Sequence, residues 1–386
     1  MTARVESATG PGAGAPAAQK VRLTSLTGAR FIAAFLVFLF HAALVGLFDT
    51  QGVNDVLLRV FSKTGWIGVS FFFLLSGFVL TWSARPGDRV TSFWRRRFAK
   101  ILPNHLVTFV IAMVLFAGTA STAVQATNLL LVHAWVPDMA HYFSLNKPNW
   151  SLATEAVFYL LFPVFYGWLQ KVPGKRLWPL AAGLAATITA IPAIALAALP
   201  ATPTVPAPDD PAPSLVYWLV YIFPPVRALD FLLGMVLARI VLTGRWPRLR
   251  VTPLVALWLA CYTGSMFLPA AYGLNAATLV PTALLVPAIA QLDISGRRSF
   301  LRNRTAERLG EISFAFYLTQ WLVLPGAMDV LGLTGQRFST PVAALLIVGW
   351  LVGTLLASWA LYELVEKPGM RLLAKPRRAR AAAVRS

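Results

Sequence analysis

Charged residues are scarce in this chain. Only 13% of its 386 residues are Asp, Glu, Lys or Arg, whereas 57% are hydrophobic and the mean hydropathy is +0.66. Charged residues supply about a quarter of an ordinary soluble domain, so this composition excludes a water-soluble globule and predicts an integral membrane protein. Because apolar stretches recur along nearly the whole chain, we expect one membrane domain rather than two or three soluble ones.

Cysteine and strand-like alternation are nearly absent as well. The single Cys261 lies within an apolar stretch and permits neither an internal disulfide nor a thiolate metal site, so we expect it to fill the core, and we expect no metal. The stretch FIAAFLVFLFHAALVGLF at 31–48 is apolar on every face. This pattern disfavours the alternating strands of an outer-membrane barrel and favours helices.

Acidic residues are few relative to basic ones. Asp and Glu number 15 against 34 Lys and Arg, which gives a formal net charge of +19. Such a surplus is typical of proteins that bind nucleic acid, an anionic membrane surface or an anionic small ligand. The basic residues fall in short clusters between apolar segments, and no basic domain interleaved with aromatic residues is present. We therefore exclude nucleic acid as a partner and retain the lipid bilayer and an anionic ligand.

Several apolar segments have the length of about 20 residues that a bilayer core requires. They cover residues 31–48, 65–82, 103–120, 151–170, 177–199, 226–243, 252–270, 272–292, 311–330 and 341–364. Two further apolar segments, 126–137 and 214–225, are short, and we assign them to the membrane interface or to re-entrant packing. The predicted fold is an all-α integral membrane protein, a bundle of about ten transmembrane helices.

Basic residues gather in every second loop, as the positive-inside rule requires of cytoplasmic loops. The clusters lie at 85–100, 171–176, 245–250, 297–308 and 375–385. We therefore expect both termini in the cytoplasm and the protein in a bacterial cytoplasmic (inner) membrane. Residues 1–20 lack the pattern of a signal peptide and should form a disordered cytoplasmic tail, followed by the membrane domain at 21–370 and a basic cytoplasmic tail at 371–386.

Ionisable residues inside apolar segments are expensive and are therefore candidates for chemistry. Arg30 and His41 lie about 16 Å apart along the first helix and on roughly the same face, so one elongated substrate could meet both. Glu155, in the sequence NWSLATE, is expected at a depth similar to that of His41. A carboxylate that holds one imidazole nitrogen leaves the other free to take a proton from a hydroxyl. The spacing is equally compatible with two groups that find separate partners.

Two other features admit a structural explanation as readily as a functional one. Arg227 and Asp230 are three residues apart and fit an ion pair that staples one helix. The segment at 68–78, GVSFFFLLSGF, holds Ser76 among small and aromatic residues, which serve helix packing as readily as substrate contact. No nucleophile elbow, phosphate loop or metal-spaced histidine cluster is present in the sequence.

Seven segments spread over most of residues 22–370 form an ordered series. They read LTGARFIAAFLVFLFH, GVSFFFLLSGFVL, RRRFAKILP, NWSLATEAVFYLLFP, PPVRALDFLLGM, LGEISFAFYLTQ and ELVEKPGMR. On these segments, in this order, the chain resembles the acyltransferase-3 family of integral membrane O-acyltransferases. The resemblance implies transfer of an acyl group, usually from cytoplasmic acyl-CoA, to a hydroxyl of a sugar, polyketide, peptidoglycan or other surface glycan.

The resemblance also implies roles for individual residues. The predicted catalytic residues are Arg30, His41 and Glu155, with His41 as general base and Glu155 orienting it. The phosphates of acyl-CoA are predicted to contact Arg95, Arg96, Arg97 and Lys100. The acceptor is predicted to contact Ser76, Asn149, Trp150, Arg227, Tyr317 and Gln320.

Two positions depart from the family's pattern. The family's Arg-x-x-Arg pair is replaced by Arg97-Phe98-Ala99-Lys100, which keeps the charge but loses one bidentate guanidinium fork. Gln320 stands where the ninth-span motif usually ends in a histidine. An amide can donate and accept hydrogen bonds but does not transfer a proton, so only hydrogen bonding is expected there.

The class of acceptor is inferred from the size of the chain. Because few residues follow the last apolar segment, we expect no hydrolase-like domain of the kind that some relatives acting on cell-wall glycans carry. Stand-alone relatives of about this size include enzymes that acylate macrolides or their deoxysugars. We therefore expect transfer of a short acyl group, such as acetyl or propionyl, to a macrolide or sugar-bearing natural product. The alternatives are O-acetylation of an exported or cell-surface polysaccharide and, outside enzymes, a transporter.

Overall fold

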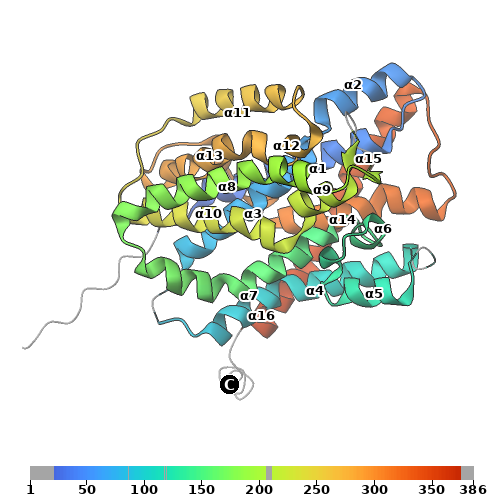
Figure 1. The fold of residues 1–386 in the computed structure, drawn as a ribbon. Helices are drawn as coiled ribbons and strands as arrows, with labels where there is room; N and C mark the ends of the chain where they lie inside the picture. Colours follow the sequence, from blue (N-terminus) through green and yellow to red (C-terminus); the bar gives the residue numbers. More distant parts are fainter. Residues whose placement is uncertain (1–20, 86, 117, 119, 206–210, 375–386) are drawn as a thin grey trace, which may run out of the picture.

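The structure is a computed structural model that describes residues 21–374 except 86, 117, 119 and 206–210. The described chain is almost entirely helical, and its long helices pack in one bundle (Figure 1). The predicted tail at 1–20 and residues 375–386 of the predicted tail at 371–386 lie outside the described residues. Residues 371–373 of the second tail complete a helix, α16 (Lys367–Leu373).

The long helices occur close to the apolar segments found in the sequence. They are α1 (Thr24–Val45), α3 (Thr64–Ser83), α4 (Val90–Phe116), α7 (Asn149–Lys171), α8 (Leu177–Ala198), α10 (Pro224–Leu242), α11 (Val251–Ser265), α13 (Ala276–Ile294), α14 (Arg304–Val330) and α15 (Thr340–Leu361). Shorter helices connect them, namely α2 (Gln51–Phe61), α5 (Thr122–Leu129), η2 (His133–Trp135), α6 (Met139–Tyr142), η3 (Gly174–Arg176), α9 (Ser214–Tyr217), η4 (Trp218–Ile222), α12 (Ala270–Gly273), η5 (Phe300–Arg302) and η6 (Tyr362–Glu366). One short antiparallel ribbon joins β1 (Thr204–Val205) to β2 (Ala212–Pro213).

Within the described residues, seven helical stretches are long and apolar enough to cross a membrane. They coincide with seven of the predicted segments, which supports an all-α, multi-pass membrane protein. The other three predicted segments fall on α10, α11 and α14. Helix α11 has only 15 residues, and α10 and α14 carry several charged residues. The count of about ten spans therefore stays a prediction.

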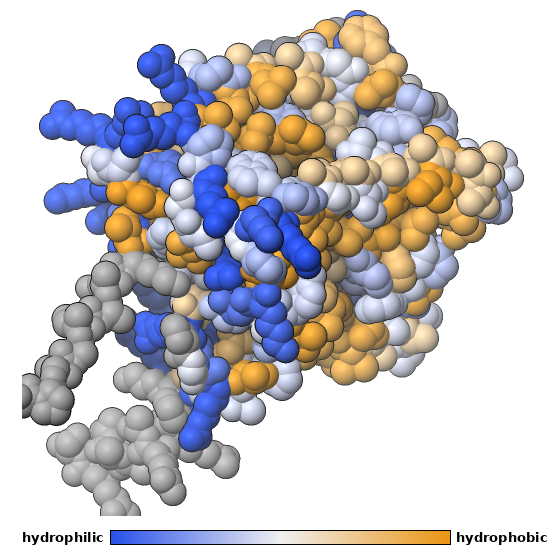
Figure 2. Space-filling view, turned by 60° about the vertical axis from the view of Figure 1, so that its left-hand side comes forward, coloured by the Kyte–Doolittle hydropathy of each residue, from blue (hydrophilic) through white to orange (hydrophobic). Residues whose placement is uncertain are grey.

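Hydrophilic side chains gather at one end of the molecule, while much of the remaining surface in the same view is apolar (Figure 2). The basic loops between α7 and α8 and between α10 and α11 lie side by side. Trp178, which follows the first loop, donates a hydrogen bond of 3.3 Å to the carbonyl of Arg245 in the second. Both loops are found at the same end of the bundle in Figure 1. The positive-inside rule predicts that this shared end faces the cytoplasm, and that orientation stays a prediction.

Helices α3 and α10 approach each other at two glycines. A Cβ on Gly77 of α3 would lie 1.9 Å from the carbonyl oxygen of Phe231, and a Cβ on Gly234 of α10 would lie 1.9 Å from that of Leu74. The two backbones are therefore in contact, as small residues permit between membrane helices. This contact fixes α3, which contributes residues to both cavities described below.

We expect Gly234→Val to accumulate in membranes at a small fraction of the wild-type amount, because its side chain would overlap the backbone of α3. Gly183→Val in α8 is the matched control, since nothing lies within 4 Å of a Cβ at that position. Size-exclusion chromatography of detergent-solubilised fluorescent fusions measures the folded yield. Equal yields from the two variants would contradict the close α3–α10 contact.

Candidate functional site

Two cavities adjoin inside the bundle. The first, called the cation cavity, has a volume of about 130 Å³ and is lined by residues of α1, α3, α4, α7 and α14. The second, called the aromatic cavity, has a volume of about 360 Å³. Val69 and Tyr317 line both, so these two side chains mark the boundary at which the cavities meet.

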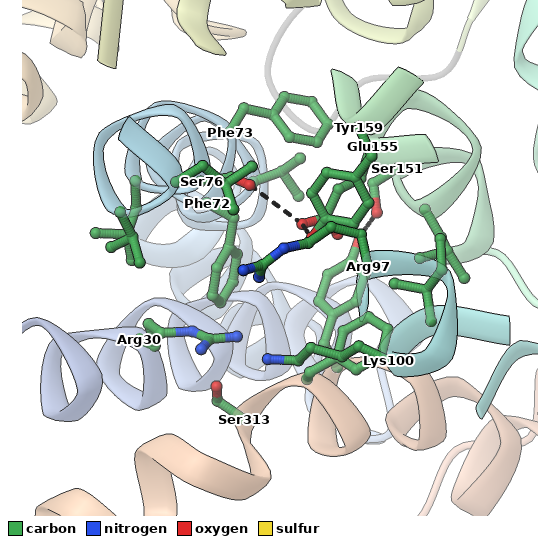
Figure 3. A pocket seen from close by; sticks show the side chains of 18 residues that line it. Arg30, Phe72, Phe73, Ser76, Arg97, Lys100, Ser151, Glu155, Tyr159 and Ser313 are labelled. Atoms are coloured by element: carbon green, nitrogen blue, oxygen red, sulfur yellow. Dashed lines mark hydrogen bonds between the residues drawn. The ribbon is translucent and has the colours of Figure 1, made fainter. Parts of the chain in front are cut away.

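Three cations converge on the cation cavity. Arg30 enters from α1, and Arg97 and Lys100 enter from α4, with their charged ends directed toward one another (Figure 3). Among the described residues, none of the three forms an ion pair within 4 Å. Only one carboxylate, Glu155, lines the same cavity. Clustered positive charge with so little compensation favours an anionic ligand.

Only two of the four basic residues predicted to hold phosphates point into the cation cavity. Arg97 and Lys100 share a face of α4 because residues three apart in a helix are neighbours on its surface. Arg95 points elsewhere, and its Nε donates a hydrogen bond of 3.1 Å to the carbonyl of Ala374. Arg96 forms an ion pair with Asp88. The four residues therefore do not line one cavity together, and the contact of each with the phosphates of acyl-CoA stays a prediction.

Glu155 belongs to the cation cavity and not to His41. Its Oε1 accepts hydrogen bonds from the hydroxyls of Ser76, at 3.3 Å, and Tyr159, at 2.5 Å (Figure 3). Among the described residues, no hydrogen bond joins Glu155 to His41, so the predicted imidazole–carboxylate pair is not formed. Equal depth in two helices does not make two side chains meet: α7, which carries Glu155, packs on α3, α4 and α10, whereas α1 packs chiefly on α3 and α14.

His41 lines the aromatic cavity and has a different neighbour. Its ring is edge-on to Trp321, with centroids 5.1 Å apart, and the side chain of Gln320 reaches the imidazole. Nδ1 of His41 and Oε1 of Gln320 are both enclosed, and neither has a hydrogen-bond partner among the described residues. A hydrogen bond donated by Nδ1–H to this amide oxygen would satisfy both atoms. The structure therefore places Gln320 where the sequence suggested Glu155.

The amide of Gln320 is itself held in place. Its Nε2 donates a hydrogen bond of 3.1 Å to the carbonyl of Tyr317, and its own backbone carbonyl accepts one of 2.6 Å from the indole of Trp350. The side chain is fully buried. A fixed amide can hold the imidazole in one orientation and one tautomer, which is the task of an orienting residue.

The aromatic cavity combines aromatic walls with two basic side chains. Its aromatic lining consists of Phe40, Trp66, Phe143, Trp150, Tyr217, Tyr221, Tyr317 and Trp321. The two basic side chains are His41 and Lys147. The ammonium nitrogen of Lys147 lies 4.3 Å from the ring centroid of Trp321, and burial lowers the pKa of this lysine. Such walls bind the apolar faces of ring compounds, while a few polar groups fix their orientation.

The remaining predicted contacts divide between the cavities and the packed core. Ser76 lines the cation cavity, Trp150 the aromatic cavity and Tyr317 both. Asn149 lines neither, and its Nδ2 lies 3.4 Å from Nδ1 of His105. Asn149 therefore contacts His105 at the start of α7, and its contact with the acceptor stays a prediction.

Arg227 also lines neither cavity. It is fully buried between α3 and α10, where Nη2 donates a hydrogen bond of 2.7 Å to Ser70 and Nη1 lies 3.2 Å from a carboxylate oxygen of Asp230. Asp230 also accepts a hydrogen bond of 2.9 Å from Asn275. The predicted ion pair is confirmed, and the predicted contact of Arg227 with the acceptor stays a prediction.

Several lining residues were not predicted from the sequence. Ser151 and Tyr159 flank Glu155 by four residues on the same helix face, and Ser313 precedes Tyr317 by four, so helical spacing around known candidates would have found them. Lys147 and Trp321 come from different segments, and no local signal connects them. In the part of the chain that the structure describes, no three His, Cys, Asp or Glu side chains are grouped so as to hold a metal ion.

Comparison with known proteins gives one family match and several relatives. A family described as an acyltransferase domain, acyltransferase-3, matches residues 23–363. The chain is 41% identical over 371 residues to the acyltransferase MdmB of Streptomyces mycarofaciens, covering 92% of this chain and 94% of MdmB.

More distant relatives are longer proteins. The chain is 27% identical over 337 residues to the putative peptidoglycan O-acetyltransferase YrhL of Bacillus subtilis, covering 79% of this chain and 50% of YrhL. It is 27% identical over 220 residues to the peptidoglycan O-acetyltransferase OatA of Listeria monocytogenes, covering 50% of this chain and 32% of OatA. No solved structure matches the chain.

Proposed function

Because the chain belongs to the acyltransferase-3 family and is an acyltransferase, we propose that it moves a short acyl group from acyl-CoA to a hydroxyl of a macrolide or other sugar-bearing natural product. The observation that carries this proposal is the junction of the two cavities at Val69 and Tyr317. A cationic cavity suits an anionic acyl donor, and an aromatic cavity suits a ring-containing acceptor. Transfer requires the two to meet at one point.

The donor would enter from the end of the bundle that carries the basic loops, which is the cytoplasmic end under the proposed orientation in the inner membrane. Arg30, Arg97 and Lys100 would hold its phosphates. From Arg30 to His41 the first helix rises about 16 Å, at ~1.5 Å per residue. An extended pantetheine arm can follow this path and deliver the thioester to the boundary at Tyr317.

The chemistry would be direct transfer. In the proposed step, Oε1 of Gln320 accepts the Nδ1–H of His41. Nε2 of His41 takes the proton of the acceptor hydroxyl while the hydroxyl oxygen forms a bond to the thioester carbonyl carbon. Collapse of the tetrahedral intermediate breaks the carbon–sulfur bond, and the proton on Nε2 passes to the departing thiolate. The products are the ester and free CoA. Glu155 would hold Ser76 and Tyr159 in place beside the donor.

The size and lining of the aromatic cavity favour a small ring-containing acceptor. A cavity of 360 Å³ holds a sugar or part of a macrolide, and its eight aromatic side chains offer flat apolar faces to such rings. Similarity to YrhL and OatA supports the second candidate, O-acetylation of a surface polysaccharide. The extended similarity to MdmB, over nearly the full length of both chains, leads us to place the small-molecule acceptor first.

Purified protein in lipid nanodiscs, supplied with acetyl-CoA or propionyl-CoA, tests the choice of acceptor. We expect a glycosylated macrolide to gain a mass of one acyl group and to release stoichiometric CoA. Acetylation of peptidoglycan fragments or polysaccharide with no acylation of macrolides would favour the second candidate. Absence of CoA release with every acceptor would refute acyl-CoA as the donor.

Replacement of Gln320 tests the orienting role of its amide. We expect Gln320→Leu to lower kcat by about tenfold, because the imidazole loses the hydrogen bond that fixes its tautomer, with little change in KM for acyl-CoA. Gln320→His should restore most of the rate, since an imidazole can accept the same hydrogen bond. Steady-state kinetics of the two variants gives the comparison, and equal activity of Gln320→Leu and wild type would remove Gln320 from the mechanism.

A further inference from the structure

A third cavity adjoins the cation cavity at the opposite side from the aromatic one. It has a volume of about 190 Å³ and lies between the end of α3, the start of α4 and the second half of α7. It shares Leu80 and Arg97 with the cation cavity. The proposed mechanism uses only Arg97 among its lining residues, so the rest of the cavity has no assigned role.

One wall of this cavity is a stack of three aromatic rings. The rings of Phe93 and Phe162 are 4.7 Å apart and inclined by 22°, and those of Phe162 and Tyr166 are 5.4 Å apart and inclined by 24°. All three residues line the cavity. The ring of Tyr166 ends the series, and a planar heterocycle can extend the stack by lying on it.

The same cavity is also lined by guanidinium groups. Arg85, Arg96 and Arg97 line the cavity, and Asp88 is its one carboxylate. Asp88 holds the guanidinium of Arg96 in an ion pair. Arg97 lies over the ring of Phe93, with 5.6 Å between its Cζ atom and the ring centroid, and forms no ion pair among the described residues. Guanidinium groups bind phosphates through paired hydrogen bonds, so this part of the lining suits a phosphorylated ligand.

Aromatic rings and guanidinium groups that line one cavity are the features that a nucleotide requires. On the basis of the proposed function, we propose that this third cavity binds the nucleotide end of the acyl donor. Its adenine stacks on Tyr166, and its 3′-phosphate replaces Asp88 as the ion-pair partner of Arg96. Arg97, shared by both cavities, then receives the diphosphate, from which the pantetheine arm continues past Arg30 and Lys100 toward Tyr317.

The test compares donors with and without the nucleotide. We expect Tyr166→Ala to raise both the Kd of CoA, measured by isothermal titration calorimetry, and the KM of acetyl-CoA by about tenfold. Loss of one aromatic ring that stacks on a base weakens nucleotide binding by about this factor in other proteins. The KM of S-acetylpantetheine, which has no nucleotide, should not change. The matched control is Trp168→Ala, an exposed aromatic residue on the same helix that lines none of the three cavities.

The role of Arg96 has its own readout. Wild type should bind CoA more tightly than 3′-dephospho-CoA, and Arg96→Met should bind the two equally. A rise in KM for acetylpantetheine as large as that for acetyl-CoA in Tyr166→Ala would overturn the proposal, as would equal affinity of wild type for CoA and pantetheine. Binding of CoA that depends on Tyr166, without turnover of any acceptor, would instead refute the proposed function and leave the nucleotide site standing.

Discussion

Replacement of His41 by alanine is expected to lower kcat by about 10²- to 10⁴-fold, the usual contribution of a general base. His41 lines the aromatic cavity, and the other ionisable nitrogen there, that of Lys147, is held over Trp321. The KM for acyl-CoA should change little, since the cations that would hold the donor line the other cavity. The measurement is the rate of CoA release by purified protein at saturating acceptor.

The matched control for this variant is His141→Gln. His141 lies in α6 and lines neither cavity, and its Nε2 lies 2.8 Å from the hydroxyl of Thr127. We expect it to keep near-normal kcat and folded yield. If His41→Ala retains more than a tenth of the wild-type rate, the general base lies elsewhere.

Replacement of Arg97 by methionine is expected to raise the KM for acyl-CoA by about 10- to 100-fold. A hydrogen bond to a charged group contributes about 1.5–3 kcal/mol, and methionine removes the guanidinium while keeping much of the apolar stem. Lys100→Arg should lower the KM or leave it unchanged, since it restores a second bidentate fork on the same face of α4. Initial rates over a range of acyl-CoA concentrations give both values.

Arg95→Met is the matched control for Arg97→Met. Arg95 belongs to the same basic run but bonds to the carbonyl of Ala374, outside the cavities. The two variants remove the same charge from the same helix, so they separate direct contact from the general positive potential. Equal rises in KM would show that only the potential matters, and that rise should then vanish at high salt.

The positions of the long helices followed from the sequence because hydropathy and segment length are local properties. The ion pair of Arg227 with Asp230 was predictable for the same reason, since both residues lie on one helix, three apart. Helical periodicity also predicts that the basic residues at 95–100 lie on different faces of one helix. Arg97 and Lys100 share a face, and Arg95 does not lie on it. Treating the run as one cluster ignored that period.

The neighbour of His41 was not predictable from a single sequence. Residues 41 and 320 are far apart in the chain, and only the packing of α1 on α14 brings Gln320 to the imidazole. The expected partner, Glu155, lies on a helix that turns it toward Ser76 instead. Depth in a membrane follows from counting residues, whereas the direction of a side chain around its helix axis relative to other helices depends on tertiary packing.

The central claim is that one protein passes an acyl group directly from acyl-CoA to a hydroxyl at the junction of two cavities. The most direct measurement follows radiolabelled acetyl from acetyl-CoA in a single turnover with purified protein and a glycosylated macrolide. Our account predicts that label leaves CoA and enters the macrolide as an ester at the same rate, and that His41→Ala blocks both. Label that remains on CoA in the wild type, or that accumulates on the protein before reaching the macrolide, would contradict it.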